Sequence, residues 1–253
     1  MSVKPLEGKI AIVTGAGQGV GRGIALALAR HGAKVALLGR TLAKVEATAE
    51  ECGNGARGFH VDIKDAEAIK AATAQVIEAF GGVDILVNNA QEVPLGTLDK
   101  VTDEAFLAGF ESGPIATMRM MKACRASMTE RGGGVIINLT SSATIRWDMA
   151  GYGPYAAVKK AIQALTRAAA AEWGPEGIRV LNIAPHADSP GLKSWIEARP
   201  AEAEAFFKTI PLRRIGRCEE DIGEAVAALC GPSFSYLTGA TIPLDGGQAN
   251  FDG

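Results

Sequence analysis

The chain has 253 residues, of which 47% are hydrophobic and 21% charged, with a formal net charge of -2 and a pI near 6.0. This length and composition predict one domain with a substantial core over residues 1–253. The near-neutral charge lacks the basic patch that nucleic acids or acidic membranes require, so both are excluded as partners. There is no signal-peptide pattern and no apolar stretch of about 20 residues, so we expect a cytoplasmic chain without a membrane span.

Short β-branched apolar runs alternate with longer alanine-rich stretches. Strands are predicted at residues 10–14, 35–38, 58–61, 83–88, 135–139, 179–183 and 240–244. Helices are predicted at residues 19–31, 42–51, 66–80, 103–130, 152–173 and 219–229. Most strands lack polar alternation and should be buried on both faces. The pattern predicts an α/β fold, with a doubly wound, seven-stranded, mostly parallel sheet covered by helices on both faces.

One long irregular stretch, residues 186–211, follows the sixth predicted strand. It carries several prolines around a short helical piece near residues 192–198. In open α/β sheets, segments that leave the carboxyl ends of strands surround the ligand crevice. We therefore expect residues 186–211 to form a substrate lid.

The four cysteines are scattered and show no spacing typical of metal ligands. We therefore expect reduced thiols and no metal site. The residues concerned are Cys52, Cys124, Cys218 and Cys230.

A glycine-rich turn, Thr14 to Gly21, joins the first predicted strand to the first predicted helix. Glycines at such a turn permit a tight bend and close approach of the backbone to a pyrophosphate, and the helix N-terminus offers free N–H groups. The turn therefore predicts a dinucleotide site rather than a merely flexible loop. The expected cofactor contacts in it are Gly15, Gln18, Gly19, Val20 and Gly21.

The second predicted strand ends in Leu38-Gly39-Arg40, without the acidic residue that holds the ribose 2′-hydroxyl in many NAD sites. An arginine at this place suits the 2′-phosphate of NADP. We therefore expect NADP(H) to be preferred, with NAD(H) as the other cofactor to be tested. The alternative is that Arg40 is an ordinary solvated residue.

Tyr155 and Lys159 lie four residues apart in the predicted helix 152–173, and therefore on one face of it. A nearby ammonium group favours the phenolate, which lets a tyrosine exchange a proton with an alcohol or a carbonyl. The spacing alone also occurs by chance, with a solvated lysine. The pair is a candidate acid/base only in combination with other signals.

These signals together resemble the short-chain dehydrogenase/reductase family over essentially the whole chain. Thr14 to Gly21 matches its TGxxxGxG turn, Asn88-Asn89-Ala90 its NNA signature, and Ser142 stands at the usual interval before Tyr155. Asp62 follows the third strand, where the family contacts adenine. The resemblance implies a Rossmann-like single domain that transfers hydride between a nicotinamide cofactor and a small carbonyl or alcohol substrate. It also implies a homo-oligomer, either a tetramer or a dimer.

The family pattern assigns a role to each matching residue. By resemblance, Ser142 orients the substrate oxygen, Tyr155 is the acid/base, and Lys159 lowers the pKa of Tyr155 and holds the nicotinamide ribose. Ser141 is the rival serine, because the strand before it is one residue longer than usual. The further cofactor contacts that the resemblance implies are Asp62, Ile63, Asn89, Ala90, Pro185 and Asp188, together with Tyr155 and Lys159.

The sequence departs from this pattern at three places. Gly113 stands where the family carries an asparagine that sustains a water-mediated proton path to the lysine, and Pro114 beside it should bend the helix. Gln91 replaces the last glycine of NNAG and either narrows the crevice or points outward. His186 and Asp188 replace a glycine and an apolar residue in the nicotinamide loop. Two interpretations are open: one of them contacts a polar group of the substrate, or His186 is a loop histidine that bonds only to backbone.

Two functions follow. The first is a carbonyl reductase or alcohol dehydrogenase, with a 3-oxoacyl reductase as a variant of it. The alternative is a catalytically weak nucleotide-binding or regulatory protein that keeps the fold. The presence of Ser142, Tyr155 and Lys159 together favours the enzyme, because a binding module does not need all three.

Overall fold

The computed structural model describes residues 4–146 and 150–249. Its strands are β1 (Ile10–Thr14), β2 (Lys34–Gly39), β3 (Arg57–His60), β4 (Ile85–Asn88), β5 (Gly134–Leu139), β6 (Ile178–Pro185) and β7 (Thr241–Leu244). Its α-helices are α1 (Gly19–Arg30), α2 (Leu42–Cys52), α3 (Ala66–Phe80), α4 (Asp103–Phe110), α5 (Ala116–Glu130), α6 (Gly153–Trp173), α7 (Pro190–Ala198), α8 (Pro200–Phe207) and α9 (Glu224–Cys230). All seven predicted strands are present.

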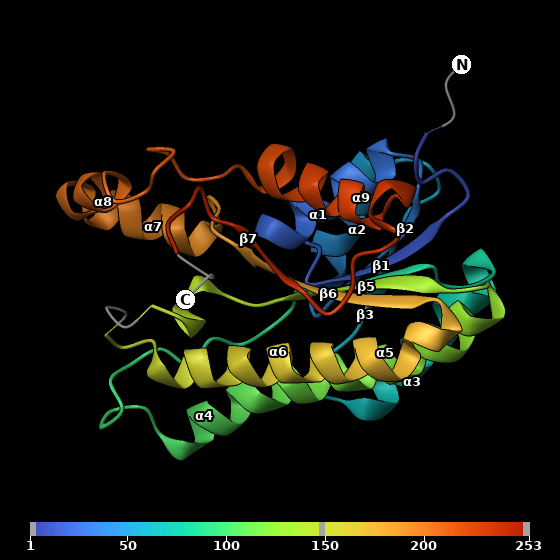
Figure 1. Cartoon of the computed structure of the whole chain (residues 1–253), viewed down its shortest axis with the longest axis horizontal. Coiled ribbons are helices and arrows are strands. Elements are labelled where there is room, and N and C mark those ends of the chain that lie inside the picture. Colours follow the sequence, from blue (N-terminus) through green and yellow to red (C-terminus); the bar gives the residue numbers. More distant parts are fainter. Residues whose placement is uncertain (1–3, 147–149, 250–253) are drawn as a thin grey trace.

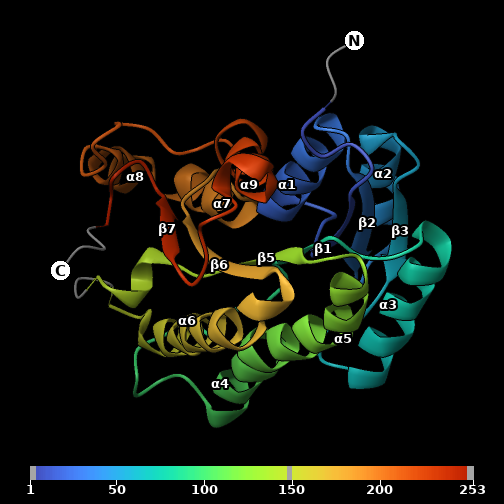
Figure 2. The same cartoon turned by 45° about the vertical axis from the view of Figure 1, so that its right-hand side comes forward.

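The strands form one sheet in the order β3-β2-β1-β4-β5-β6-β7, and every neighbouring pair is parallel. Helices α1, α2 and α9 cover one face of the sheet, and α3 to α6 cover the other (Figures 1 and 2). The predicted doubly wound fold is confirmed. Strand order reverses between β1 and β4, and in such sheets ligands bind at the carboxyl ends of the strands at this point.

The core lies on both faces of the sheet, which is why the strands lack polar alternation. Along β1, Ala11 and Val13 belong to the apolar cluster under α1 and α9, whereas Ile10 and Ile12 belong to the cluster under α3 and α5. Each strand residue therefore contributes to one of two cores. Hydrophobic burial on both sides fixes the sheet as the central layer.

The predicted helix 103–130 is interrupted. Its middle is a π-helical turn (η1, Glu111–Ile115), and inside it Gly113 has φ -92° and ψ -106°, outside the helical region. Pro114 follows, and because proline has no N–H it removes one helical hydrogen bond. The expected bend at Pro114 is confirmed, and the axis is divided into α4 and α5.

The segment after β6 contains two helices, α7 and α8, where the sequence predicted one. Helix α8 was missed because Pro200 indicates a break, whereas at the first turn of a helix proline is well tolerated. Both helices lie at one end of the molecule, beside β7 (Figure 1). Whether residues 186–211 act as a lid stays a prediction.

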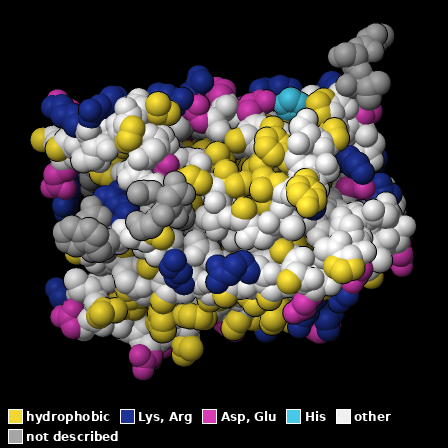
Figure 3. Space-filling model, in the orientation of Figure 1, with side chains coloured by type: hydrophobic (Ala, Val, Ile, Leu, Met, Phe, Trp, Pro, Cys, Tyr) yellow, Lys and Arg dark blue, Asp and Glu magenta, His cyan; other side chains and the backbone are white. Residues whose placement is uncertain are grey.

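Apolar side chains gather along the lower edge of the view in Figure 3, over α4 and α6. Leu107 on α4 is 65% exposed, and Leu98 in the loop before α4 is 81% exposed.

Within the described residues, no helix is both long and apolar enough to cross a bilayer.

Candidate active site

The glycine turn between β1 and α1 is held by backbone geometry. Gly15 and Gly19 have φ of 65° and 56°, values that favour glycine. A Cβ on Gly21 would overlap the Gly15 carbonyl oxygen and lie 2.5 Å from Asn89 Nδ2. Val20 packs against the core beneath the turn. The turn thus closes only with glycines at these positions.

The NNA segment locks this turn in place. Thr14 Oγ1 accepts hydrogen bonds from the backbone N–H groups of Asn89 (3.0 Å) and Ala90 (3.1 Å). The Asn89 side chain donates to the carbonyl oxygens of Thr14 (2.9 Å) and Gly15 (3.2 Å). The structure therefore brings the first and fourth strand ends together, and Asn89 supports the turn through its side chain.

The N-terminus of α1 is suited to an anion. Gln18 precedes the helix without a side-chain capping bond, and the first turn contains no acidic residue. The free N–H groups and the dipole of a 12-residue helix attract a phosphate group. The Gln18 side chain instead accepts a bond from Lys44 Nζ at 3.1 Å. The residues at this turn therefore fit the pyrophosphate of a dinucleotide.

Basic residues surround the end of β2. Arg40 follows β2, and its Nη1 lies 3.1 Å from Glu92 Oε1, to which Lys64 Nζ lies at 3.0 Å. Asp62 follows β3 and accepts a bond from the Lys64 backbone N–H at 2.9 Å, while Ile63 packs partly buried against the core. These residues form the rim expected for the adenosine part of a cofactor. Glu92 was not predicted, and no sequence motif pointed to it.

Tyr155 contacts Ser141. Its phenol is hydrogen-bonded to the Ser141 hydroxyl, whereas Ser142 begins a short 3-10 turn (η2, Ser142–Thr144). Ser141 has extended dihedral angles, φ -156° and ψ 150°, so it continues the direction of β5. Counting back from Tyr155 without gaps selects Ser142, whereas the serine that contacts Tyr155 lies one residue earlier. The loop from β5 to α6 is therefore one residue longer than that count assumes. This geometry favours Ser141, the rival serine, over the expected Ser142.

Burial changes the pKa values of Tyr155 and Lys159 in opposite directions. Desolvation raises the pKa of Tyr155 to about 12, against the lowering effect of the Ser141 hydrogen bond. Desolvation lowers the pKa of Lys159 to about 7. Lys159 is 4% exposed, and its Nζ donates to the Leu139 carbonyl oxygen at 2.6 Å and lies 5.5 Å from the Tyr155 ring centre. The structure therefore places the buried Lys159 beside the partly buried Tyr155.

A row of polar side chains crosses the buried sheet and anchors α6. Asn88 Nδ2 donates to Asn138 Oδ1 at 2.8 Å, and Asn138 Nδ2 donates to Thr166 Oγ1 of α6 at 2.8 Å. Thr166 Oγ1 in turn donates to Asn182 Oδ1 at 2.8 Å. These neighbouring strand residues are in register. Because buried polar groups must find partners, this row fixes α6, and with it Tyr155, against the strand ends.

The segment after β6 returns to the glycine turn. Pro185 ends β6 in register with Leu244 of β7. A Cβ on Gly19 would lie 3.1 Å from Pro190 Cδ, so the start of α7 lies against the glycine turn. The Asp188 carboxylate is engaged by Lys193 Nζ (2.9 Å) and the Cys218 N–H (3.1 Å). Asp188 thus fastens this segment through its side chain.

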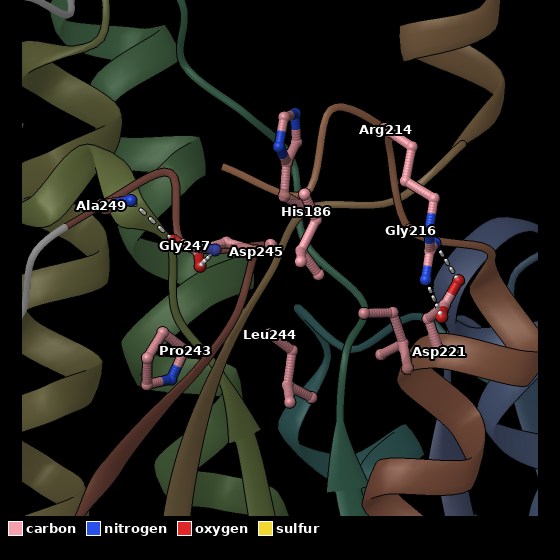
Figure 4. Close-up of a pocket in the computed structure, with 12 residues that line it drawn as sticks. His186, Arg214, Gly216, Asp221, Pro243, Leu244, Asp245, Gly247 and Ala249 are labelled. Atoms are coloured by element: carbon pink, nitrogen blue, oxygen red, sulfur yellow. Dashed lines mark hydrogen bonds and ion pairs between the residues drawn. The ribbon is translucent and has the colours of Figure 1, made fainter. Parts of the chain in front are cut away.

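His186 lines a cavity of about 300 Å³ between β6, β7 and the segment after α8 (Figure 4). Its Nδ1 is buried and has no hydrogen-bond partner among the described residues, and its ring packs edge-on against Phe206, with 5.3 Å between the ring centres. Burial lowers the pKa of His186, and the Asp245 carboxylate opposes this effect. Tyr155 does not line this cavity. Whether His186 contacts a polar group of the substrate stays a prediction.

The Gln91 side chain turns toward the interrupted helix. From the sequence, Gln91 was expected either to narrow the crevice or to point outward, and neither prediction included this contact. A Cβ on Gly113 would lie 3.1 Å from Gln91 Nε2 and 2.7 Å from Val158 Cγ1. Gln91 thus lies beside Gly113, the position at which the resemblance led us to expect an asparagine. Among the described residues, no cluster of side chains suited to hold a metal ion occurs, and the described cysteines are all free.

Known proteins resemble this chain over almost its whole length. The family model described as enoyl-(acyl carrier protein) reductase matches residues 15–249. The 12α-hydroxysteroid dehydrogenase of Clostridium sp. is 36% identical over 253 residues, covering 96% of this chain and 97% of the relative. L-xylulose reductase of Mesocricetus auratus is 36% identical over 245 residues, with 96% and 97% covered.

A solved structure also resembles this chain closely. A 7α-hydroxysteroid dehydrogenase complexed with NADH and 7-oxo glycochenodeoxycholic acid has a TM-score of 0.90 at 31% identity, covering 98% of this chain and 96% of that one. These relatives are oxidoreductases, so the alternative of a weak nucleotide-binding or regulatory protein is not favoured. The chain is an oxidoreductase that belongs to the short-chain dehydrogenase/reductase family.

Proposed function

We propose that this protein is an NADP(H)-preferring reductase of ketones and dehydrogenase of the corresponding secondary alcohols. The observation that carries the proposal is the contact of Tyr155 with Ser141, one helical turn from Lys159. A bound nicotinamide supplies or accepts the hydride in this chemistry. The chain itself supplies the proton and the orientation of the substrate oxygen.

Tyr155 is the proton donor in the reductive direction. With its pKa raised by burial to about 12, the phenol is protonated at neutral pH. It donates its proton to the carbonyl oxygen as that oxygen becomes an alkoxide, and the O–H bond of the product forms as that of Tyr155 breaks. Ser141 holds the same oxygen by a hydrogen bond. A Lys159 ammonium group nearby stabilises the phenolate that remains.

The end of β2 supports the preference for NADP(H). Arg40 has a side chain that is 61% exposed and currently faces the Glu92 carboxylate. A 2′-phosphate offers a stronger, charge-assisted acceptor for the same guanidinium. No acidic residue stands at the end of β2, where a ribose 2′-hydroxyl would be held in an NAD site. Glu92 is then released from Arg40 and retains Lys64.

The loop before α4 supports a bulky, apolar substrate. Val93 and Leu95 are 50% and 54% exposed. The loop is joined to the start of α6 by a bond from the Gly96 N–H to the Gly151 carbonyl oxygen at 2.8 Å. It therefore forms an apolar rim near Tyr155. Exposed apolar side chains beside a site are typical of apolar ligand recognition.

We also propose that the protein is a homo-oligomer. Ala157, Ala164 and Ala168 are exposed on α6, which packs against α4, and Leu107 of α4 is exposed as well. Small side chains allow helices of two copies to approach closely, and a second copy would cover this apolar face. Light scattering on the purified protein should give a mass above that of one 26.2 kDa chain.

The test of the activity is a substrate panel with NADPH and NADH. The panel contains an oxidised 12α-hydroxysteroid, L-xylulose, and the ketoses formed from sorbitol and galactitol. We expect turnover with NADPH, the highest kcat/KM for the steroid, and a loss of about 10²–10⁴-fold in kcat for Tyr155→Phe with unchanged NADPH binding. Absence of turnover with every member of the panel, or an active Tyr155→Phe, would contradict the proposal.

A further inference from the structure

Two buried polar atoms beside the cavity of Figure 4 have no hydrogen-bond partner among the described residues. They are Nδ1 of His186, which lines the cavity, and Nε2 of Gln248, which stands between the lining residues Gly247 and Ala249. An amide nitrogen can only donate, and imidazole Nδ1 donates in one of the two neutral tautomers. Buried groups of this kind are disfavoured unless a partner reaches them. The cavity therefore has two unused donors beside it.

The charged side chains that line the same cavity are already paired. Both oxygens of Asp245 accept backbone N–H groups, from Gly247 at 3.0 Å and from Ala249 at 2.9 Å. The Arg214 guanidinium donates two hydrogen bonds of 2.7 Å to the Asp221 carboxylate. The carboxylates of the cavity wall are thus engaged, whereas the two donors are not. The capacity that remains is for a ligand group that accepts hydrogen bonds.

The cavity has the size and the lining for one end of a ligand. Its volume of about 300 Å³ lies at the lower limit for sites that bind small molecules. The uncharged part of its wall is mostly apolar and includes Leu212, Ile222, Pro243 and Leu244. An acceptor group at the end of a short apolar stretch fits this combination.

The loop after β5 connects this cavity with the candidate acid/base. The Thr140 N–H donates to the Ile183 carbonyl oxygen at 2.8 Å, so the chain that leads to Ser141 runs beside the end of β6. The same loop continues to Arg146. Besides burial, the positive charge of Arg146 lowers the pKa of His186. A guanidinium group on the loop that carries Ser141 therefore acts electrostatically at His186.

We propose that this cavity is a subsite for the carboxylate of an oxo acid or hydroxy acid substrate, with His186 and Gln248 as its two donors. The inference rests on the proposed function, because Tyr155 and Ser141 hold the carbonyl group at the other end of the same molecule. A carboxylate has only acceptors and can give one oxygen to each donor. A hydroxyl group would add a donor, and the carboxylates of the cavity wall are engaged. The charge of Arg146 also favours an anion.

The subsite acts on binding and not on proton transfer, because its donors do not touch the reacting oxygen. Hydrogen bonds to a charged group stabilise a complex more than neutral ones do. A substrate that carries the carboxylate should therefore be distinguished from its neutral ester mainly through KM.

The first experiment compares linear methyl ketones that carry a terminal carboxylate with their methyl esters, using the wild type and NADPH. The chains range from about five to twelve carbons, because their length has to match the span from Tyr155 to the cavity. We expect the acid to exceed its ester in kcat/KM by at least about tenfold at the best length. Equal constants for acid and ester at every length would overturn the proposal.

Variants of the two donors test their roles separately. His186→Phe keeps an aromatic ring against Phe206 and removes Nδ1, and Gln248→Met keeps the volume and removes Nε2. Each should reduce the ratio of acid to ester in kcat/KM by about tenfold, and His186→Asn, whose amide nitrogen can replace Nδ1, should restore most of it. The matched control is His31→Asn at the end of α1, which should keep the wild-type ratio. A wild-type ratio in either His186→Phe or Gln248→Met would overturn the proposal.

A binding measurement separates this proposal from the proposed function. Octanoate has no carbonyl group that could be reduced, so it tests the subsite without turnover. We expect octanoate to raise the pH at which His186 titrates in NMR spectra, because a bound anion favours the imidazolium, and methyl octanoate to leave it unchanged. The signal is assigned by its loss in His186→Phe. Absence of a shift with octanoate would overturn the proposal even in an active enzyme, whereas a shift in an inactive enzyme would contradict only the proposed function.

Discussion

The two parts of the candidate site are built by different means. At the glycine turn, the backbone of one short segment determines the shape of the site, because Gly15, Gly19 and Gly21 allow a bend that side chains would block. At Tyr155, side chains from separate elements meet: Ser141 comes from the end of β5, and Tyr155 and Lys159 come from α6. The glycine turn has no room for side chains at these glycines. The arrangement around Tyr155 depends instead on how the strand ends and α6 are aligned.

The difference extends to burial. The N-terminal end of α1 offers N–H groups that need no change in protonation. The tyrosine end relies on a buried phenol and a buried amine whose pKa values are both displaced by desolvation. Substitutions at the turn should therefore abolish cofactor binding, and substitutions at the tyrosine end should alter turnover and its pH dependence.

The largest effect is expected for Gly21→Ala. Its Cβ would overlap the Gly15 carbonyl oxygen and crowd Asn89 Nδ2, so the turn must open. We expect NADPH binding to weaken by more than about 100-fold, together with a clear loss of Tm, since backbone cannot yield cheaply. Gly174→Ala is the matched control, because it has helical dihedral angles and nothing within 4 Å of an added Cβ. Titration of NADPH fluorescence measures the binding, and tight binding by Gly21→Ala would refute the backbone argument.

The serine prediction is next in size. Ser141→Ala should lower kcat by about 100-fold, because it removes the hydroxyl that contacts the Tyr155 phenol. Ser142→Ala, in the adjacent 3-10 turn, should stay within about threefold of the wild type. Steady-state kinetics of the two variants decide between the neighbouring serines. The reverse order of effects would restore Ser142 to the role that the gap-free count gave it.

A smaller effect is expected at the end of β2. Arg40→Ala should reduce kcat/KM with NADPH by about tenfold relative to NADH, as one charge-assisted interaction with the 2′-phosphate is lost. Glu92→Gln should change the ratio in the opposite direction, because Glu92 competes for Arg40 at 3.1 Å. Arg57→Ala, at the amino end of β3, is the control and should leave the cofactor ratio unchanged. An unchanged ratio in Arg40→Ala would identify Arg40 as a solvated surface residue.

The smallest effect concerns stability against pH in the cofactor-free protein. Burial lowers the pKa of Lys159 from 10.5 to about 7, so the unfolded chain binds more protons between these values. The free energy of unfolding should therefore rise with pH across this window, and Lys159→Met should flatten the rise by at least about 1 kcal/mol. The raised pKa of Tyr155 acts above its ordinary value of 10.0 and so lies outside most of this window. Urea unfolding measures the slope, and the exposed neighbour variant Lys160→Met should retain it.

The sequence was sufficient for features that one short segment specifies. Apolar runs of strand length, glycines at the first turn and the helical spacing of Tyr155 and Lys159 are local patterns, and each was found where it was predicted. Pro114 likewise predicted a bend from the chemistry of one residue. These features follow from backbone sterics and hydrophobic periodicity, which need no knowledge of distant contacts.

Only the tertiary structure decided which distant groups meet. Counting residues favoured Ser142, but the direction of the chain leaving β5 placed Ser141 at Tyr155. His186, which the sequence placed only in the segment after the sixth strand, lines a cavity together with residues of β7 and of the segment after α8. Gln91 and Gly113 are far apart along the chain, and the fold brings them together where Gly113 also lies against Val158 of α6. Local sterics and periodicity can be read from a sequence, whereas loop register and side-chain proximity depend on how the packed elements are aligned in space.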